Sequence, residues 1–359
     1  MQELRVGLGD RSYPIIIESG CIRNIGQDLL AKKVGKRYGV IADDRVAGLF
    51  GATLLKSLER AGLNAELITF PQGEANKTLK TIENLAGALV RSGFDRKDAL
   101  IALGGGVTGD IAGFLASAFM RGIPFVQIPT TLLAQVDSSV GGKTGVDIPE
   151  GKNLVGAFYQ PKAVYIDLSV LKSLPREELL GGLAEVIKYG VIRDAAFFDF
   201  LSDNRTRILG LDEKLLARMV FTCCRIKAEV VSEDEREGGV RRILNYGHTI
   251  GHAVEGASDY SLIHGLAVAI GMAAAARLAV LTGHLAEEDA ARINNLLREY
   301  GMPVEIPKDL DRQRLRKYLL ADKKVVGGKV NYVLPTAIGS TCITADVSDE
   351  LVDRILAGE

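Results

Sequence analysis

Residues 98–117, DALIALGGGVTGDIAGFLAS, decide the fold class of this 359-residue chain. The stretch has the pattern of a short apolar strand, a glycine-rich turn and the first turns of a helix. Gly104, Gly106 and Gly109 satisfy the spacing G-x-G-x-x-G, which places backbone N–H groups and a helix N-terminus where a pyrophosphate can bind. The alternative is a glycine turn with a purely structural role.

The acid that usually accompanies such a loop is missing from its usual place. In a standard dinucleotide site a carboxylate binds the ribose about 20 residues after the loop, at the end of the next strand. Here that region is FVQIPTT, residues 125–131, which contains no acid. Asp43 and Asp44 end an earlier candidate strand, and a carboxylate there would bind a ribose hydroxyl and disfavour the 2′-phosphate of NADP. We therefore expect dinucleotide binding with a non-standard strand order.

The chain changes character along its length. Up to about residue 170, short β-branched runs alternate with helical stretches, which predicts a parallel sheet with helices on both faces. From residue 174 onward the apolar residues mostly follow the helical period. We expect an N-terminal Rossmann-like α/β domain over 1–175 and a mostly α-helical domain over 176–359, with the active site in the cleft between them.

The composition argues against several classes of protein. The 44 basic and 45 acidic residues nearly cancel, so nothing resembles the basic footprint of a nucleic-acid-binding protein. The first ten residues lack the apolar run of a signal peptide, and the longest clean apolar run, residues 265–276, is too short to cross a bilayer. No C-x-x-C pair occurs, which indicates free thiols in a reducing compartment. We expect a soluble cytoplasmic protein without nucleic-acid or membrane partners.

A long polar segment, residues 132–158, follows the strand that ends in IPTT. Its charged and amide side chains include Asp137, Lys143, Asp147, Lys152 and Asn153. α/β proteins place ligand contacts in such segments after strand ends, and lysines bind phosphates as point charges. The alternative is a solvated surface loop, but apolar residues at 154, 155 and 158 bracket the charges and favour a ligand-binding role.

Three of the four histidines lie within residues 248–264, where they are either ordinary polar residues or a metal site. His248 and His252 are four residues apart and share a helix face, as in many zinc sites. One ligand set therefore combines these two with Glu255. Another combines His248 with His264 and a distant carboxylate such as Glu185, which would be costly to bury unpaired. Spacing does not choose between the sets. Either would be a catalytic site, with three ligands and an open position.

Taken together, these segments resemble the 3-dehydroquinate synthases, members of the sugar-phosphate cyclase superfamily. The similarity runs in order and nearly from end to end. The matching stretches are 71–79, 104–117, 120–147, 151–158, 183–190, 234–255, 264–272 and 322–324.

The resemblance implies a reaction of the shikimate pathway of aromatic amino-acid biosynthesis. In it 3-deoxy-D-arabino-heptulosonate 7-phosphate, a phosphorylated sugar acid, becomes 3-dehydroquinate and phosphate. NAD oxidises a ring hydroxyl transiently, phosphate is eliminated, the ketone is reduced again, and an intramolecular aldol step closes the carbocycle. The family also implies Zn²⁺, with Co²⁺ as a substitute, and a homodimer.

The resemblance also implies roles for individual residues. The metal ligands would be Glu185, His248 and His264, and the catalytic residues would be His252 as a proton shuttle, Glu237 and Lys143. The substrate-binding residues would be Arg121 (supplied across the dimer interface), Asp137, Lys143, Asn153, Lys188, Lys227, Arg241, Asn245 and Lys324. The NAD-binding residues would be Asp43, Glu74, Lys77, Gly105, Gly106, Val107, Thr108, Gly109, Asp110, Thr130, Thr131, Lys143 and Lys152.

Three other functions compete with this interpretation. A related sugar-phosphate cyclase would make a cyclitol from a substrate without the carboxylate, and the presence of Lys227, Arg241 and the triplet 322–324 argues against it. A metal-dependent NAD alcohol dehydrogenase would release NADH to solvent and usually has more metal-binding histidines. A non-catalytic NAD-binding protein would not need the metal ligands and the cations.

Overall fold

The computed structural model describes residues 1–321, 325–326 and 329–358. The chain forms two compact units, Met1–Leu174 with Leu216–Glu235, and Pro175–Leu215 with Arg236–Glu359. Most of helix α9 (Glu213–Glu233) therefore packs with the first unit, whereas the sequence pattern assigned the whole of 176–359 to a second domain. Helical periodicity shows that α9 is a helix but does not indicate which core its apolar face joins.

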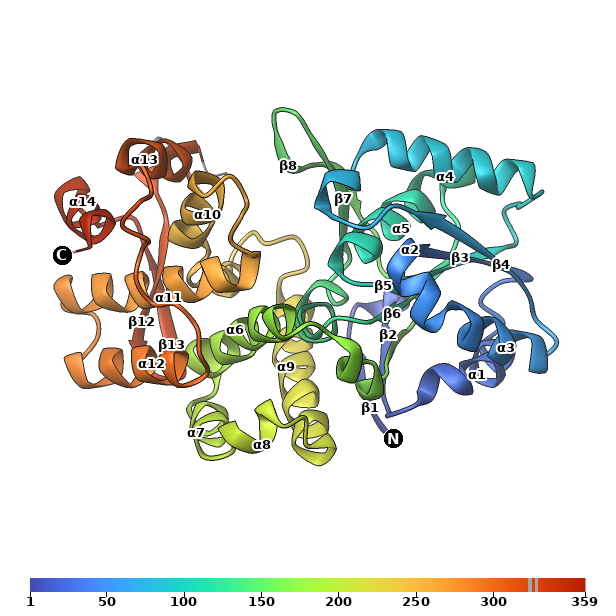
Figure 1. The fold of residues 1–359 in the computed structure, drawn as a ribbon, viewed down its shortest axis with the longest axis horizontal. Helices are drawn as coiled ribbons and strands as arrows, with labels where there is room; N and C mark the ends of the chain where they lie inside the picture. The colour runs from blue at the N-terminus through green and yellow to red at the C-terminus, as the bar shows by residue number, and fades with distance from the viewer. Residues whose placement is uncertain (322–324, 327–328, 359) are drawn as a thin grey trace. The chain divides into compact units, whose positions relative to one another are not determined.

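The first unit contains a seven-stranded sheet in the order β1-β2-β9-β6-β5-β3-β4 (Figure 1). All neighbouring strands are parallel except β1, which pairs antiparallel with β2. This confirms the predicted parallel α/β sheet. The strands are β1 (Gln2–Val6), β2 (Tyr13–Ile17), β3 (Arg37–Asp43), β4 (Asn64–Phe70), β5 (Ala99–Gly104), β6 (Phe125–Pro129) and β9 (Val164–Ile166).

The sheet has an apolar core on each face. In β3, Tyr38, Val40 and Ala42 join one core and Ile41 joins the other, as expected for a strand that is buried on both sides. The first core includes residues of α1 (Ile25–Lys32) and α3 (Ala52–Arg60), and the second includes residues of α4 (Leu79–Arg91) and α5 (Gly106–Ala118).

The strand order creates a switch point beside β3. From β3 the chain continues to β4 on one side of β3 and then to β5 on the other. In open α/β sheets, ligands bind outside the carboxyl ends of the strands at such a point. Asp43 is the last residue of β3 and Gly104 is the last residue of β5, so the acid and the glycine loop share this edge. The glycine loop thus lies beside the upstream strand β3, which ends in Asp43. This is the position expected from the absence of an acid in residues 125–131.

The second unit is mainly helical, which confirms the predicted change of architecture. Helix α11 packs against α6, α10, α12 and strand β12. Its length and composition alone would allow it to span a membrane, but 78% of it is buried within the protein, as in the core helix of a soluble protein. The unit's elements are α6 (Arg176–Arg193), α7 (Ala195–Asp203), α8 (Arg205–Leu209), α10 (His248–Ala257), α11 (His264–Leu281), α12 (Glu287–Glu299), α13 (Arg312–Ala321), β10 (Val325–Val326), β11 (Lys329–Val330), β12 (Tyr332–Ala337), β13 (Ser340–Thr344) and α14 (Asp349–Ala357).

Glycines allow the helices of this unit to approach closely. A methyl group on Gly271 of α11 would lie 1.9 Å from the carbonyl oxygen of Gly247, which precedes α10. A methyl group on Gly265 would lie 2.1 Å from the carbonyl oxygen of Gly181 in α6. Real side chains do not tolerate such distances to backbone atoms, so glycine at these positions sets the spacing of α6, α10 and α11.

We predict that Gly271→Ala destabilises the protein by about 1–3 kcal/mol, because the added methyl group forces α10 and α11 apart. Urea unfolding followed by circular dichroism measures the change. The matched control is Gly48→Ala, because a methyl group on Gly48 meets nothing within 4 Å. Equal stability of the two variants would contradict the proposed steric role of Gly271.

Candidate functional site

The carboxyl edge of the sheet in the first unit gathers several of the predicted cofactor-binding residues. Asp43 ends β3 and is 8% exposed. Its Oδ1 accepts a hydrogen bond from the backbone N–H of Val46 at 2.9 Å, which caps the short helix α2 (Asp44–Val46), and Thr108 Oγ1 donates to its Oδ2 at 3.5 Å. Thr130 and Thr131 directly follow β6, at the same edge of the sheet.

The glycine loop ends in an open helix N-terminus. Helix α5 starts at Gly106, and its N-cap Gly105 offers no side chain to the first-turn N–H groups. A methyl group on Gly104 would lie 2.3 Å from Thr108 Oγ1, so this turn admits only glycine. Because the first N–H groups of a helix carry partial positive charge and lack intrahelical partners, this end of α5 suits a phosphate group.

Lys77 links three of the predicted cofactor- and substrate-binding segments. Its side chain is almost fully buried, and its Nζ lies 2.6 Å from Asp110 Oδ2 in α5 and 2.6 Å from Asn153 Oδ1. Glu74 Oε1 lies 4.0 Å from Lys77 Nζ and 3.9 Å from Lys152 Nζ. Burial acts to lower the pKa of Lys77, but the charges of Asp110 and Glu74 outweigh it and raise that pKa above its ordinary value.

The polar segment after β6 forms an antiparallel hairpin of β7 (Lys143–Ile148) and β8 (Gly151–Phe158). Asn153 has the left-handed φ of 55°, a conformation that asparagine tolerates better than most residues. Asp147 Oδ1 accepts from the backbone N–H of Asn153 at 2.7 Å, and the backbone N–H of Asp147 donates to the carbonyl oxygen of Lys77 at 2.8 Å. Asp147 thus orders Asn153, a function that the sequence did not indicate.

The other predicted residues of the first unit differ in their surroundings. Lys227 in α9 is 6% exposed, and its Nζ donates to both the carbonyl oxygen and the Oδ1 of Asp137, each at 2.6 Å. This lysine therefore neutralises a carboxylate in the same unit. Lys143 and Arg121 are exposed, and Arg121 has a left-handed φ of 68°.

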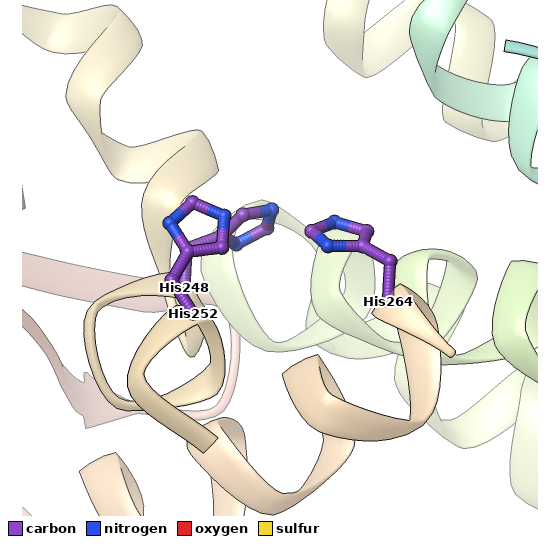
Figure 2. Close-up of side chains that lie close together, drawn as sticks. All are labelled: His248, His252 and His264. Atoms are coloured by element: carbon purple, nitrogen blue, oxygen red, sulfur yellow. The ribbon is translucent and has the colours of Figure 1, made fainter. Parts of the chain in front are cut away.

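In the second unit the three histidines converge on one another (Figure 2). His248 and His252 come from α10 and His264 is the first residue of α11. Their candidate ligand atoms all lie within 4.8 Å of one another. His248 is buried, His264 is partly buried and His252 is exposed. The cluster could hold a metal ion.

Glu185 of α6 completes this group from a position that is 1% exposed. Its Oε1 lies 3.4 Å from His248 Nε2 and 3.8 Å from His264 Nε2. Lys188, also 1% exposed, forms an ion pair with Glu185 one helical turn away. A buried carboxylate without a cation is unfavourable, so Lys188 offsets the negative charge of Glu185.

The outer nitrogens of two histidines are held by acceptors. His248 Nδ1 lies 3.1 Å from the carbonyl oxygen of Tyr246, and His264 Nδ1 lies 2.9 Å from Glu255 Oε2. Because a carbonyl oxygen accepts only, Nδ1 of His248 must carry the proton. The lone pair of Nε2 in the neutral ring is then available to a metal ion on the side of the ring that faces Glu185. Burial acts to lower the pKa of His264, but the hydrogen bond and charge of Glu255 outweigh it and raise that pKa.

The remaining predicted residues of this unit lie around the turn before α10. Arg241 is 2% exposed and belongs to the 3₁₀ helix η8 (Val240–Asn245). The side-chain amide of Asn245 donates to the carboxylate of Glu237. The backbone of Glu237 has a left-handed φ of 62°. Lys324 lies outside the described residues. The predicted residues within the described part of the chain thus divide into two groups, one in each unit.

Comparisons with known proteins point to one family. A model described as the N-terminal part of 3-dehydroquinate synthase matches residues 67–181, and one for its C-terminal part matches residues 182–325. A 3-dehydroquinate synthase of Thermodesulfovibrio yellowstonii is 49% identical over 357 residues, covering 99% of each chain.

Solved structures give the same picture at lower identity. A 2-deoxy-scyllo-inosose synthase, complexed with carbaglucose-6-phosphate, NAD⁺ and Co²⁺, is 28% identical with a TM-score of 0.92 and 99% of each chain covered. A 2-epi-5-epi-valiolone synthase from Streptomyces hygroscopicus subsp. jinggangensis 5008, with NAD⁺ and Zn²⁺ bound, is 29% identical with a TM-score of 0.89, covering 98% of this chain and 97% of that one.

The Lys77 contacts predict a stability effect. Lys77→Met should destabilise the protein by about 2 kcal/mol, because Asp110 loses a charged hydrogen-bond partner in a largely buried position. Urea unfolding measures the change. The control is Lys80→Met, whose ion pair with Glu83 has both side chains about 70% exposed and should contribute less than about 0.5 kcal/mol. An equal loss in both variants would rule out a special role for the buried pair.

Proposed function

This chain belongs to the 3-dehydroquinate synthase family, and we propose that its two groups of polar residues bind NAD and a divalent metal ion for the reaction of that family. The reaction converts 3-deoxy-D-arabino-heptulosonate 7-phosphate to 3-dehydroquinate and phosphate. The observation that carries the metal assignment is the convergence of Glu185 Oε1 with the Nε2 atoms of His248 and His264.

These three side chains suit a divalent ion in geometry and charge. Ligand atoms about 2.1 Å from a tetrahedral zinc ion are about 3.4 Å apart, and the two contacts of Glu185 Oε1 measure 3.4 and 3.8 Å. Glu185 adds the negative charge that a set of three histidines would lack. A dication at this point would also stabilise a carboxylate that has almost no access to water. We therefore assign Glu185, His248 and His264 as ligands in preference to the three histidines.

His252 is not a metal ligand under this assignment, and we assign it to proton transfer. It lies beside the proposed ligands but is exposed to solvent, and an imidazole that titrates near neutral pH can carry a proton between a substrate hydroxyl and water. When bound, the metal supplies a Lewis acid and NAD supplies the hydride acceptor and donor. Asn245 and Glu237, which contact one another, are assigned to bind hydroxyl groups of the substrate.

The first unit is assigned the cofactor and part of the substrate. Asp43 would bind a ribose hydroxyl, and the N-terminus of α5 would bind the pyrophosphate. The two cyclitol-forming relatives contain NAD⁺ with Co²⁺ or Zn²⁺, which supports the same pair of cofactors here, with Zn²⁺ proposed first. The remaining NAD contacts are assigned to Glu74, Lys77, Asp110, Thr130, Thr131, Lys143 and Lys152.

The substrate is a phosphorylated sugar acid, and its two anionic groups need cations. We assign them to Lys143, Lys188, Lys227, Arg241 and Lys324, with Arg121 contributed by the second protomer of a homodimer. Lys188 and Lys227 are buried and paired with carboxylates, so they would also fix the positions of Glu185 and Asp137. A cytoplasmic location completes the proposal.

The cyclitol-forming alternative is disfavoured by the sequence identities. The chain is 49% identical to a 3-dehydroquinate synthase over almost its full length and 28–29% identical to the two cyclitol-forming enzymes. A substrate without a carboxylate would also have only its phosphate to bind, and the cations listed above are more than one phosphate requires.

The turnover prediction tests the redox cycle. Purified protein supplied with Zn²⁺, substrate and NAD at a small fraction of the substrate concentration should release phosphate without accumulating NADH, because NAD is regenerated in each cycle. Phosphate release and absorbance at 340 nm are the two measurements. A chelator should abolish release and added Zn²⁺ should restore it. Stoichiometric NADH formation would identify a dehydrogenase instead.

The ligand assignment predicts a difference between two histidine variants. His264→Ala should lose at least about 10-fold in zinc affinity, because it removes one of three ligands. His252→Ala should retain its zinc while losing most of its turnover. Metal content after dialysis and phosphate release provide the comparison. Equal zinc loss in the two variants would reject the assignment of Glu185, His248 and His264.

A further inference from the structure

Glu255 occupies a position beside the metal site that suits a role other than that of a ligand. It lies in the last turns of α10 and is 7% exposed. Its Oε2 is 2.9 Å from Nδ1 of His264, the ring nitrogen opposite the one that faces Glu185. The sequence pattern offered Glu255 as a direct ligand with His248 and His252, whereas the structure places its carboxylate behind a histidine of the cluster.

We propose that Glu255 is a positioning residue that fixes the tautomer and orientation of His264 and thereby increases the affinity of the site for a divalent cation. The inference rests on the metal site proposed above. A carboxylate accepts hydrogen bonds only, so a neutral His264 beside it carries its proton on Nδ1 and presents the Nε2 lone pair to the site. Ligating histidines commonly have such a partner, which also makes the ring a stronger donor to the metal.

The two proposed histidine ligands have different hydrogen-bond partners at Nδ1. His248 Nδ1 faces the neutral carbonyl oxygen of Tyr246 at 3.1 Å, whereas His264 Nδ1 faces the charged Glu255 at 2.9 Å. His264 is also the first residue of α11, a helix without an acidic residue in its first turn or a side-chain N-cap. The partial positive charge at the N-terminus of that helix makes a ring placed there a weaker electron-pair donor to a cation. The negative charge of Glu255 opposes this effect.

Glu255 also joins the two ends of the α10–α11 connection. Its carbonyl oxygen accepts from Ser258 Oγ at 2.8 Å and from the backbone N–H of Tyr260 at 3.0 Å. Its backbone therefore orders the turn while its side chain holds His264. A substitution at this position keeps the backbone carbonyl oxygen that makes these turn contacts and changes the side chain that contacts His264.

Two substitutions and one control separate charge from hydrogen bonding. Glu255→Gln keeps an oxygen that accepts from Nδ1 but removes the charge, and Glu255→Ala removes both. Asp259→Asn is the matched control: it removes one negative charge from the same connection, but its carboxylate is 77% exposed and contacts Arg314. The control should leave the histidines unaffected.

Zinc affinity, measured on the full-length chain by competition with a chromophoric chelator, tests the proposal. We expect the dissociation constant to rise about 10-fold in Glu255→Gln and up to about 100-fold in Glu255→Ala, with Asp259→Asn unchanged. Circular dichroism of the metal-free variants checks that they are folded. Wild-type affinity in Glu255→Ala, or an equal loss in Asp259→Asn, would overturn the proposal.

The tautomer of His264 gives a readout that needs neither metal nor activity. With ¹⁵N-labelled histidine, the four imidazoles can be assigned by single substitutions. At a pH high enough for His264 to be neutral, we expect the Nδ1–H form at His264 in the metal-free wild-type chain and in Glu255→Gln, and a shift toward Nε2–H in Glu255→Ala. An unchanged tautomer in Glu255→Ala would contradict the inference about Glu255 alone. If the wild-type chain failed to bind zinc, the metal site itself would be rejected, and that result is distinguishable from a failure of Glu255 to position His264.

Discussion

The carboxylate of Glu185 is the constraint around which the second unit is built. It projects from the middle of α6 into surroundings where it is 1% exposed, and an isolated charge there would be strongly destabilising. Lys188 offsets that charge from the same helix, and the Nε2 atoms of His248 and His264 face it from two other helices. The close approach that glycines 181, 247, 265 and 271 allow brings those helices within reach of one carboxylate.

In the first unit, polar groups gather at one edge of a sheet whose central strands β5 and β6 are buried. The switch point beside β3 places Asp43 next to the glycine loop, although the two are far apart in the sequence. Asn153 of the β7–β8 hairpin contacts Lys77, and Lys77 also forms an ion pair with Asp110. Residues assigned to the cofactor and to the substrate are thus in direct contact, so the position of one influences the other.

The metal cluster shows where prediction from the residues alone stopped. The histidine spacing indicated a metal site and placed His248 and His252 on one helix face. It left two ligand sets open, because the next helix brings His264 back to the cluster and α6 supplies Glu185. The resemblance to a known family implied one of these sets, and the contacts of Glu185 support the same choice. The role of Glu255 behind His264 was not predicted, because an acid three residues after a histidine is as consistent with a ligand as with a hydrogen-bond partner.

Local and periodic features were therefore determined by the sequence itself: the parallel α/β sheet, the helical character of the second half, the glycine turn at the end of β5 and the presence of clustered histidines. These follow from side-chain periodicity and from the conformations that glycine permits over a few residues. Only the tertiary structure decided that α9 packs with the first unit, that the polar segment is a hairpin, that Lys227 pairs with Asp137, and which histidine nitrogens face Glu185. Each of those outcomes depends on long-range packing between segments, and the energy of such contacts is not encoded in the spacing of residues along either segment.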